Sequence, residues 1–422
     1  MINQFFRILL FFFPIVFLNL KHGVNFILFL MFIGAIFFLS KMDFYDLLRK
    51  TFIKSNTPFL FALAAPVIAI AISQSIRNNF YPNNWDAPMR MFLCIPIYIA
   101  ISQGWLLSSR NKTITLVWIK WSMPIALITT LISTIYLPAT NWGNYRTTYF
   151  VDPLSFCSYT LLFSFLVVIG LINSFKEEGF IYKLFCVASI SIGLYLSITS
   201  GARTGWLNLP LFIVVMWFYS LGHLCKKQQL FMILFFLGGL ATLMSFNSEL
   251  VNKFYIGAQE FVNYKMNELN QETSVAMRLS FYRMGIEYFI AQPFAGWGDL
   301  AWSKVVRDEF LIFASEETLL APKHGFHNEI ITNSVRSGIW GLISVLSLYF
   351  AATFNAVKGL YMELGGRHKL ISVIILILIS HLILAGLVTE TTNLTFLSAF
   401  IGVLLSVLLG EQKLLENNRK LV

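Results

Sequence analysis

The stretch APKHGFHNEI places two histidines, His324 and His327, three residues apart directly before a long apolar run. Two imidazoles at this spacing can bind a metal ion, and a neutral imidazole can also accept a proton near neutral pH. Zinc usually needs a third and a fourth ligand, but no cysteine lies near and no HExxH pattern occurs. We therefore expect no metal or other cofactor. His327 is the candidate general base, Asn328 helps to orient it and His324 is auxiliary; the alternative is a structural histidine pair.

Two arginines lie where they could bind an anion. Arg203 belongs to the short turn SGARTGWL between two apolar runs, and Arg278 to the stretch MRLSFYRMGIEYFIAQPFAGWG. A guanidinium group matches phosphate oxygens with two parallel hydrogen bonds, which a lysine ammonium cannot form. A lone arginine at a membrane surface can instead extend to lipid headgroups, and one on a helix can simply face water. With a histidine base, the two arginines would suit a reaction in which a lipid-linked phosphate leaves and a hydroxyl attacks.

The composition places these residues in a membrane protein. The chain is 57% hydrophobic and 12% charged, whereas a soluble domain has about 25% charged residues. Its apolar runs have roughly the 17–25 residues that cross a bilayer as a helix, and they lack the alternation of membrane strands. We predict an all-α polytopic membrane protein with about twelve transmembrane helices, at residues 5–20, 24–40, 59–76, 91–109, 113–137, 154–175, 184–200, 206–224, 230–246, 339–357, 370–388 and 394–409.

The charges of the short loops predict the sidedness of these spans. Lysines and arginines, such as Lys226 and Lys227, accumulate in the loops that are cytoplasmic if the N-terminus is cytoplasmic. Both termini are therefore expected in the cytoplasm, and the net charge of +10 is assigned to the cytoplasmic rim rather than to a nucleic-acid site. The same rule places Arg203, Arg278 and His327 on the outer side, against the charge bias.

One outer connection, residues 247–337, is much longer than the others, and long connections with their own helices are usually functional. Its pattern predicts an amphipathic helix that begins at Thr273 or Ser274 and is stopped by Pro293, and a second helix in AWSKVVRDEFLIFASEETLL. The expected domains are transmembrane helices 1–9 over residues 1–246, a helical outer loop carrying catalytic residues over 247–337, and transmembrane helices 10–12 with a cytoplasmic tail over 338–422.

Two further patterns have plain interpretations. Residues 5–20 lack a signal-peptide cleavage site and are followed at once by a second apolar run, which favours a retained first span. The four cysteines lie within or at the edge of apolar runs without zinc or redox spacing, as buried small hydrophobic residues do.

Three motifs follow one another along the chain in a fixed order. They are SGARTGWL after the seventh expected span, MRLSFYRMGIEYFIAQPFAGWG in the outer segment, and HNEIITNSVRSGIWGL leading into the tenth span. This set resembles the O-antigen ligase and polymerase superfamily of bacterial membrane glycosyltransferases. That family has an arginine in a small-residue turn, then an arginine with aromatic residues and a P-[LF]-x-G-x-G stretch, then His-Asn and G-x-x-G entering a helix. Twelve spans with a large loop between spans nine and ten resemble the family over essentially the whole chain.

The resemblance implies an O-antigen ligase, a glycosyltransferase at the periplasmic face of the bacterial inner membrane. Such an enzyme joins an O-antigen chain from undecaprenyl diphosphate to a sugar hydroxyl of the lipid A–core. By motif, Arg203 and Arg278 would bind the donor diphosphate and His327 would be the general base. Glu390, in LVTETTN, stands where members have an acidic residue, and it is assigned an auxiliary role with His324 and Asn328.

Where members often have a tryptophan after the second arginine, this chain has Phe281 and Tyr282, which could still form an aromatic wall. The nearest alternative is an O-antigen polymerase of the same superfamily, which usually spreads its arginines over two large outer loops. A protein-directed oligosaccharyltransferase would need more chain after span twelve. A lipid-linked glycan transporter or flippase would need charged or broken helices near the midplane, where the expected spans offer little beyond Lys120 and His381.

Overall fold

The computed structural model describes residues 2–43, 57–106, 113–141, 147–230, 274–298, 325–362 and 365–419, with isolated residues between 234 and 262. Every structural statement below concerns these residues. The longer helices are α1 (Ile2–Asn19), α2 (Gly23–Leu39), α4 (Thr57–Arg77), α8 (Met123–Tyr136), α9 (Pro153–Ser174), α10 (Phe180–Thr199), α11 (Leu209–Leu221), α14 (Ser274–Ala291), α16 (Glu329–Tyr361), α17 (Gly366–Gly386) and α18 (Thr395–Arg419). The shorter elements are η2 (Pro82–Trp85), α5 (Asp86–Phe92), α6 (Cys94–Ser102), α7 (Ile114–Val117), the π-helical turn η3 (Trp118–Ser122), η4 (Thr204–Asn208) and the strand pair β1 (Thr140–Asn141) and β2 (Thr147–Thr148).

The described helices make the protein a multi-pass helical membrane protein. Eight are long and apolar enough to cross a membrane, namely α4, the continuous α7–η3–α8, α9, α10, η4–α11, α16, α17 and α18, while α1 and α2 are apolar but shorter. The fourth expected span is divided at Leu93 into α5 and α6. The ninth, residues 230–246, lies almost entirely outside the described residues. The count of twelve therefore stays a prediction.

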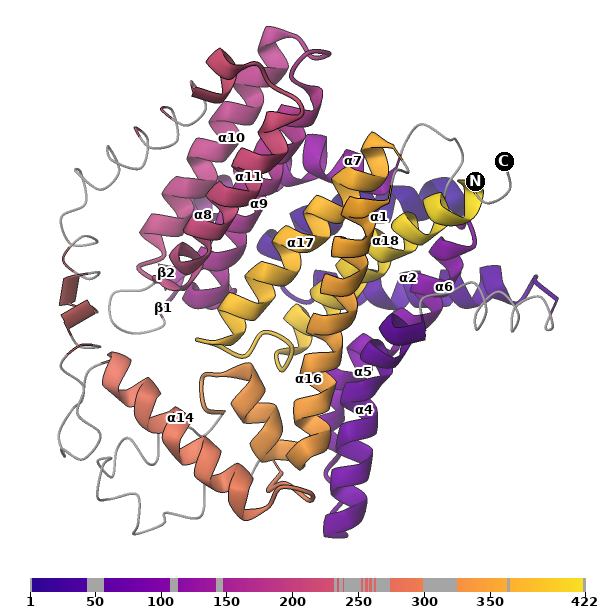
Figure 1. Ribbon diagram of the computed structural model, residues 1–422, viewed down its shortest axis with the longest axis vertical. Helices are drawn as coiled ribbons and strands as arrows, with labels where there is room; N and C mark the ends of the chain where they lie inside the picture. Colours follow the sequence, from indigo (N-terminus) through magenta and orange to yellow (C-terminus); the bar gives the residue numbers. More distant parts are fainter. Residues whose placement is uncertain are drawn as a thin grey trace.

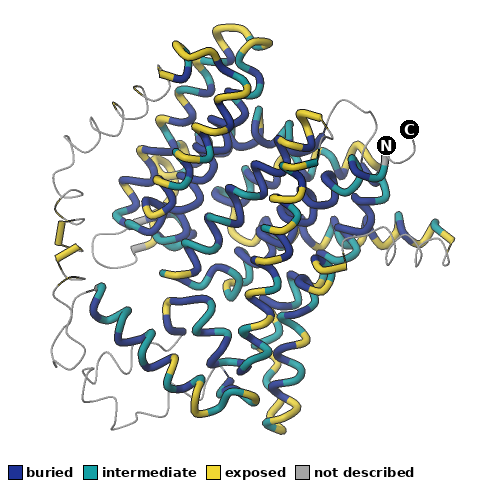
Figure 2. The backbone as a smooth tube through the Cα atoms, in the orientation of Figure 1, coloured by how far each residue is buried: buried dark blue, intermediate teal, exposed yellow. Residues whose placement is uncertain are grey.

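Helices α9 and α18 form the centre of the bundle. Buried residues make up 94% of the apolar window of α9 and 89% of that of α18, against 44% for the peripheral α4, and Figure 2 shows the buried positions concentrated in the middle helices. Phenylalanines supply much of this core. The ring of Phe17 in α1 stacks on that of Phe400 in α18 with centroids 3.8 Å apart, and Tyr159 of α9 meets Phe17 edge-on.

Side-chain hydrogen bonds show which helix termini lie at the same end of the bundle. At one end, which we call the site end, they join the end of α1 to that of α8, the start of α18 to that of α5, and η4 to the start of α9 (Asn19 to Thr130, Ser398 to Ala87, Thr204 to Leu154). At the opposite end they join the first turns of α1 and α7 to other elements (Arg7 to Leu106, Ile114 to Glu411). Alternating crossings of one membrane produce this grouping. Helix α16 begins and α17 ends at the site end, and α14 lies outside the bundle beside the start of α16 (Figure 1).

Candidate active site

Helix α14 is the amphipathic helix that the outer segment was expected to contain, and it ends two residues before Pro293. Its residues Met277, Phe281, Met284 and Tyr288 recur at intervals of four, three and four, which places them on one helical face. That face packs on side chains from the start of α16 and the turn before it, namely Val335, Ile331 and Phe326, to form a small core separate from that of the bundle. The second expected helix, at 301–320, and His324 lie outside the described residues.

A break in α16 receives the glycine-rich stretch that follows α14. Ser337 and Gly338 leave the helical conformation, Gly338 with a φ of +62° that favours glycine, so the backbone groups around them lose their partners within the helix. The carbonyls of Val335 and Arg336 instead accept hydrogen bonds from the backbone N–H groups of Trp297 (2.8 Å) and Gly298 (3.0 Å). We call this docking of residues 293–298 on the break the clasp.

The clasp is completed from both sides. The N–H of Ile339 donates to the carbonyl of Pro293 at 2.7 Å, and the hydroxyl of Ser73 at the end of α4 donates to the carbonyl of Ala295 at 2.5 Å. A side chain at Gly296 would meet the Arg336 carbonyl, because a Cβ there would lie 2.5 Å from that oxygen. The sequence suggested that these glycines only terminate α14. The structure gives them a second role, which is to bind α14 to the outer part of α16.

His327 lies at the tip of the turn that leads into α16. Its side chain is exposed and its backbone φ is +50°, a left-handed conformation that is uncommon for a residue with a side chain and often marks functional turns. The imidazole stacks on the ring of Phe281 from α14, with centroids 5.7 Å apart and planes 30° apart. Arg278 is half-buried and lies three residues before Phe281, a spacing that makes the two side chains neighbours on a helix. Arg278 therefore lies one helical turn from the ring on which His327 stacks.

Asn328 is buried and begins α16. Its side-chain oxygen accepts a hydrogen bond from the N–H of Ile331 at 3.1 Å, which caps the helix, and its side chain also hydrogen-bonds the hydroxyl of Tyr282. The Tyr282 hydroxyl donates in turn to the carbonyl of Leu387, after α17. Asn328 thus fixes the backbone next to His327 and, through Tyr282, links the start of α16 to the middle of α14 and the end of α17.

Glu390 lies half-buried beneath the His327 turn. Its carboxylate accepts hydrogen bonds from Thr332 (2.8 Å) and Asn393 (3.3 Å), and it packs so closely on Gly325 that no side chain fits at that position, where φ is +140°. Burial raises the pKa of Glu390 from 4.5 to about 7, although the nearby Arg336 opposes this shift, as do its hydrogen bonds. A carboxyl group with this pKa exchanges its proton near neutrality.

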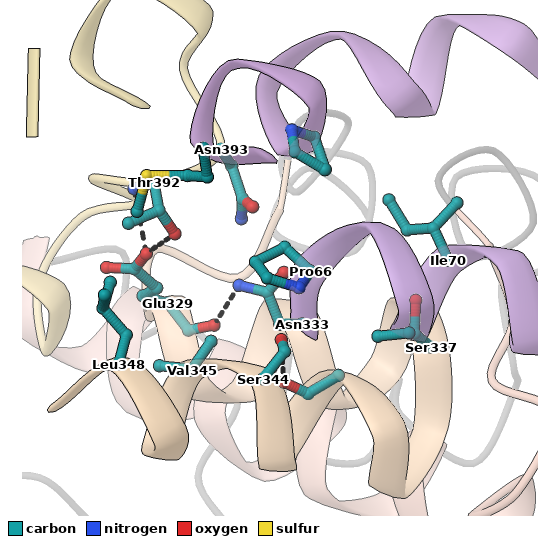
Figure 3. Close-up of a pocket in the computed structure, with 14 residues that line it drawn as sticks. Pro66, Ile70, Glu329, Asn333, Ser337, Ser344, Val345, Leu348, Thr392 and Asn393 are labelled. Atoms are coloured by element: carbon teal, nitrogen blue, oxygen red, sulfur yellow. Dashed lines mark hydrogen bonds between the residues drawn. The ribbon is translucent and has the colours of Figure 1, made fainter. Parts of the chain in front are cut away.

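Glu329, which sequence reasoning missed, has the most hydrogen bonds of the site carboxylates. It is fully buried in the first turn of α16 and accepts from the hydroxyls of Thr391 and Thr392, from the N–H of Thr392 at 2.9 Å, and from the Tyr349 hydroxyl at 3.2 Å. Figure 3 shows its carboxylate turned towards Thr392. It also borders a small cavity of about 20 Å³ between α4, α5 and α16, which is room for a water-sized molecule. The signal in the sequence was a glutamate at the very start of an apolar helix.

Arg203 lies apart from the other described candidate site residues, which surround the start of α16. It begins η4 and is half-buried, and η4 packs on α9, α11 and α17. Arg203 therefore stands at the site end beside α17, the helix that leads into the loop of Glu390. Arg336, a further arginine that the sequence did not single out, donates to Asn393 of the same loop at 2.8 Å.

The site thus combines an exposed imidazole, arginines and buried carboxylates at one end of a helical membrane bundle, beneath a helix outside it. Among the described residues, no three His, Cys, Asp or Glu side chains are grouped as a metal site would need. The class of protein that this describes is a multi-pass helical membrane protein with a cluster of polar side chains at one end of its bundle.

Comparison with known proteins narrows that class. Residues 186–346 match the family model described as O-antigen ligase, which supports the resemblance of the sequence motifs to the O-antigen ligase and polymerase superfamily. The matched region contains Arg203, Arg278 and His327. A curated Haemophilus influenzae protein, described as an uncharacterized protein, is 23% identical over 199 residues. That alignment covers 47% of this chain and 49% of the relative, so the chain spans about half the length of the curated relative that it matches.

Proposed function

We propose that the protein is an O-antigen ligase of the bacterial inner membrane. It would transfer O-antigen polysaccharide from undecaprenyl diphosphate to a sugar hydroxyl of the lipid A–core at the periplasmic face, with both termini in the cytoplasm. The family match supports a membrane glycosyltransferase with a lipid-linked polysaccharide substrate. The observation that carries the proposal is the stacking of the exposed His327 on Phe281, one helical turn from Arg278. This arrangement places a group that can accept a proton near a group that can bind an anion. A lipid-linked donor and the sugar that receives the chain could meet there.

In this mechanism His327 accepts the proton of the acceptor hydroxyl, whose oxygen attacks the anomeric carbon of the donor sugar. The bond from that carbon to the diphosphate oxygen breaks, undecaprenyl diphosphate leaves, and the anomeric centre is inverted. Arg278 and Arg203 bind the diphosphate and stabilise the negative charge that develops on it. The exposed imidazole of His327 can then release its proton to water. A positioned base typically contributes about 10²–10⁴-fold to the rate, and fixed cations in a poorly solvated site add to this.

The buried groups have supporting roles in this mechanism. Asn328 fixes the backbone beside His327 through its cap, and Glu390 holds the turn from below through Gly325 and Thr332. His324, three residues before the base, is placed at the substrate as an auxiliary residue. The diphosphate is already a good leaving group, so the chemistry needs neither a metal ion nor a nucleotide.

The decisive experiment is deletion of the gene followed by analysis of lipopolysaccharide and lipid-linked sugars. A ligase predicts that long lipid-linked O-antigen chains accumulate while the core stays unsubstituted. Core that carries a single repeat unit would instead identify a polymerase, and unchanged lipopolysaccharide would exclude both. Transfer by the purified protein in liposomes, from a defined undecaprenyl diphosphate donor to lipid A–core, would then demonstrate the activity directly.

A further inference from the structure

We propose that Glu329 is a positioning residue that ties the loop of residues 387–394 to the start of α16 and thereby holds Glu390 under the His327 turn. The inference rests on the proposed function, because it assigns Glu329 a part in the transfer reaction. Glu329 does not touch the exposed surface where the substrates would meet, so its effect has to pass through other residues. The hydrogen bonds that the Glu329 carboxylate accepts show which residues these are.

The hydrogen bonds of Glu329 join three segments that are distant in the sequence. Thr391 and Thr392 belong to the loop after α17, and Tyr349 lies twenty residues further along α16. A glutamine could fill the same volume, but its single amide oxygen would replace two carboxylate oxygens as acceptor. Some of the four donors around Glu329 would then lose their partner, and a buried donor without a partner is costly. The position of Glu329 in the first turn also favours a negative charge there, because the N-terminal end of a helix carries a partial positive charge.

The two threonines that Glu329 binds directly follow Glu390 in the chain. Glu390 directly precedes Thr391, so fixing Thr391 and Thr392 fixes the direction in which the Glu390 side chain leaves the loop. Its oxygen then meets Thr332, whose hydroxyl also accepts a hydrogen bond from the N–H of Phe326 at 2.9 Å. Phe326 directly precedes His327. A continuous chain of contacts therefore runs from Glu329 through the loop and Thr332 to the turn of the base.

Glu329 and Glu390 are also coupled by their charges. The charged groups that act on Glu390 are Arg336 and Glu329, both from α16. On α14, Tyr282 interacts with Arg278 and Asn328, and His327 stacks on Phe281. The negative charge of Glu329 contributes to raising the pKa of Glu390, and Arg336 opposes it. Neutralising Glu329 should therefore move the proton exchange of Glu390 to lower pH, whereas a purely structural loss would not.

The test compares Glu329→Gln with a matched change at the other end of the bundle. Glu411 is also fully buried and accepts from the backbone N–H groups of Ile114 (2.5 Å) and Thr115 (3.2 Å) and from the Thr115 hydroxyl. It lies sixteen residues into α18, about 24 Å from its first residue at 1.5 Å per residue. Glu411→Gln thus removes a carboxylate of the same kind far from the site.

Both variants are measured in liposomes for transfer across pH 5–9, and in detergent for thermal unfolding across the same range. Glu329→Gln should lower kcat by about tenfold to a hundredfold with little change in KM. Transfer is expected to need ionised Glu390, whose carboxylate accepts from Thr332 and Asn393. The part of the acidic limb of the rate profile that Glu390 sets, distinct from the part set by the base His327, should therefore move to lower pH. Glu411→Gln should leave that limb in place, whatever its effect on stability. Should Glu329→Gln fail to fold, Thr391→Val and Thr392→Val each remove one donor to Glu329, and each should reduce kcat in the same way.

Two results would overturn the inference. One is a Glu329→Gln protein, or a pair of threonine variants, with wild-type kcat and pH profile. The other is a loss of activity in which the acidic limb does not move, as for Glu411→Gln, which would make Glu329 merely structural. The unfolding measurement needs no substrate. It therefore distinguishes failure of this inference from failure of the proposed function. The pH midpoint at which ionisation of Glu390 destabilises the protein should fall in Glu329→Gln even if no transfer is found.

Discussion

Replacing Glu390 by glutamine is expected to stabilise the protein at neutral and alkaline pH while it impairs transfer. Glutamine fits the site, because its amide nitrogen can donate to the Thr332 hydroxyl while its oxygen accepts from Asn393, in place of the two carboxylate oxygens. What the substitution removes is the ionisation of a buried group. Since burial raises the pKa of Glu390, the folded protein binds this proton more tightly than the unfolded chain does.

The size of the effect follows from the pKa. Its ordinary value is 4.5 and its value in the folded protein is about 7, a difference of about 2.5 units that corresponds to about 3 kcal/mol at 1.36 kcal/mol per unit. A raised pKa contributes stability that is fully present below pH 4.5 and is lost as the pH rises to 7. Glutamine behaves as the protonated group at every pH. The stability difference between variant and wild type should therefore be near zero at pH 4.5 and about 3 kcal/mol at pH 8.

Thermal unfolding in one detergent at pH 5, 6, 7 and 8, followed by tryptophan fluorescence, measures this difference. The apparent Tm of Glu390→Gln should exceed that of the wild type by several degrees at pH 8 and converge with it at pH 5. Glu287→Gln is the control, because Glu287 is 40% exposed and pairs with Arg283 on the surface of α14, where an ion pair contributes little. A Tm difference that does not grow with pH, or a glutamine variant less stable than wild type at pH 8, would refute the reasoning.

His327→Ala should abolish transfer by correctly inserted protein and His324→Ala should weaken it less; near-normal transfer by the first variant in liposomes would remove His327 as the base. Arg203→Lys and Arg278→Lys should each impair transfer, since a point charge cannot replace two parallel hydrogen bonds, and full activity of both lysine variants would contradict diphosphate binding. Incubation with EDTA should leave the rate unchanged, and a loss that Mg²⁺ or Zn²⁺ restores would require a metal site. Gly325→Ala should destabilise the protein by about 1–3 kcal/mol or more through backbone strain and collision with Glu390, whereas Gly179→Ala, with open space around it, should unfold like the wild type.

Periodic features of the fold could be predicted from the sequence, and contacts between distant segments could not. The apolar runs identified the helices of the bundle, and the spacing of Met277, Phe281 and Met284 identified α14, because both depend on neighbours along the chain. The break in α16 was not predictable. Gly338 belonged to a G-x-x-G pattern entering a helix, and only the folded protein shows that the residues around it meet Gly296.

The same distinction applies to the candidate site. His327 and Arg278 stood out because polar groups are conspicuous beside apolar runs, and the structure places them together through Phe281. Glu329 did not stand out, since a glutamate in the first turn of a helix is a common favourable choice. Its importance depends on Thr391 and Thr392, more than sixty residues away.

The clasp has a consequence for how such a site can change over time. The chain is anchored at Gly298, which donates to the carbonyl of Arg336, and again at Gly325, which lies against Glu390, so both ends of residues 299–324 are fixed to the same few turns of structure. Closing a longer loop between fixed ends costs little, about 0.6 kcal/mol for each doubling of its length. Insertions, deletions and wholesale exchange within 299–324 can therefore accumulate without moving the imidazole. Under the proposed function, a different acceptor sugar could be gained through sequence changes within residues 299–324, while Gly298 and Gly325 keep their contacts.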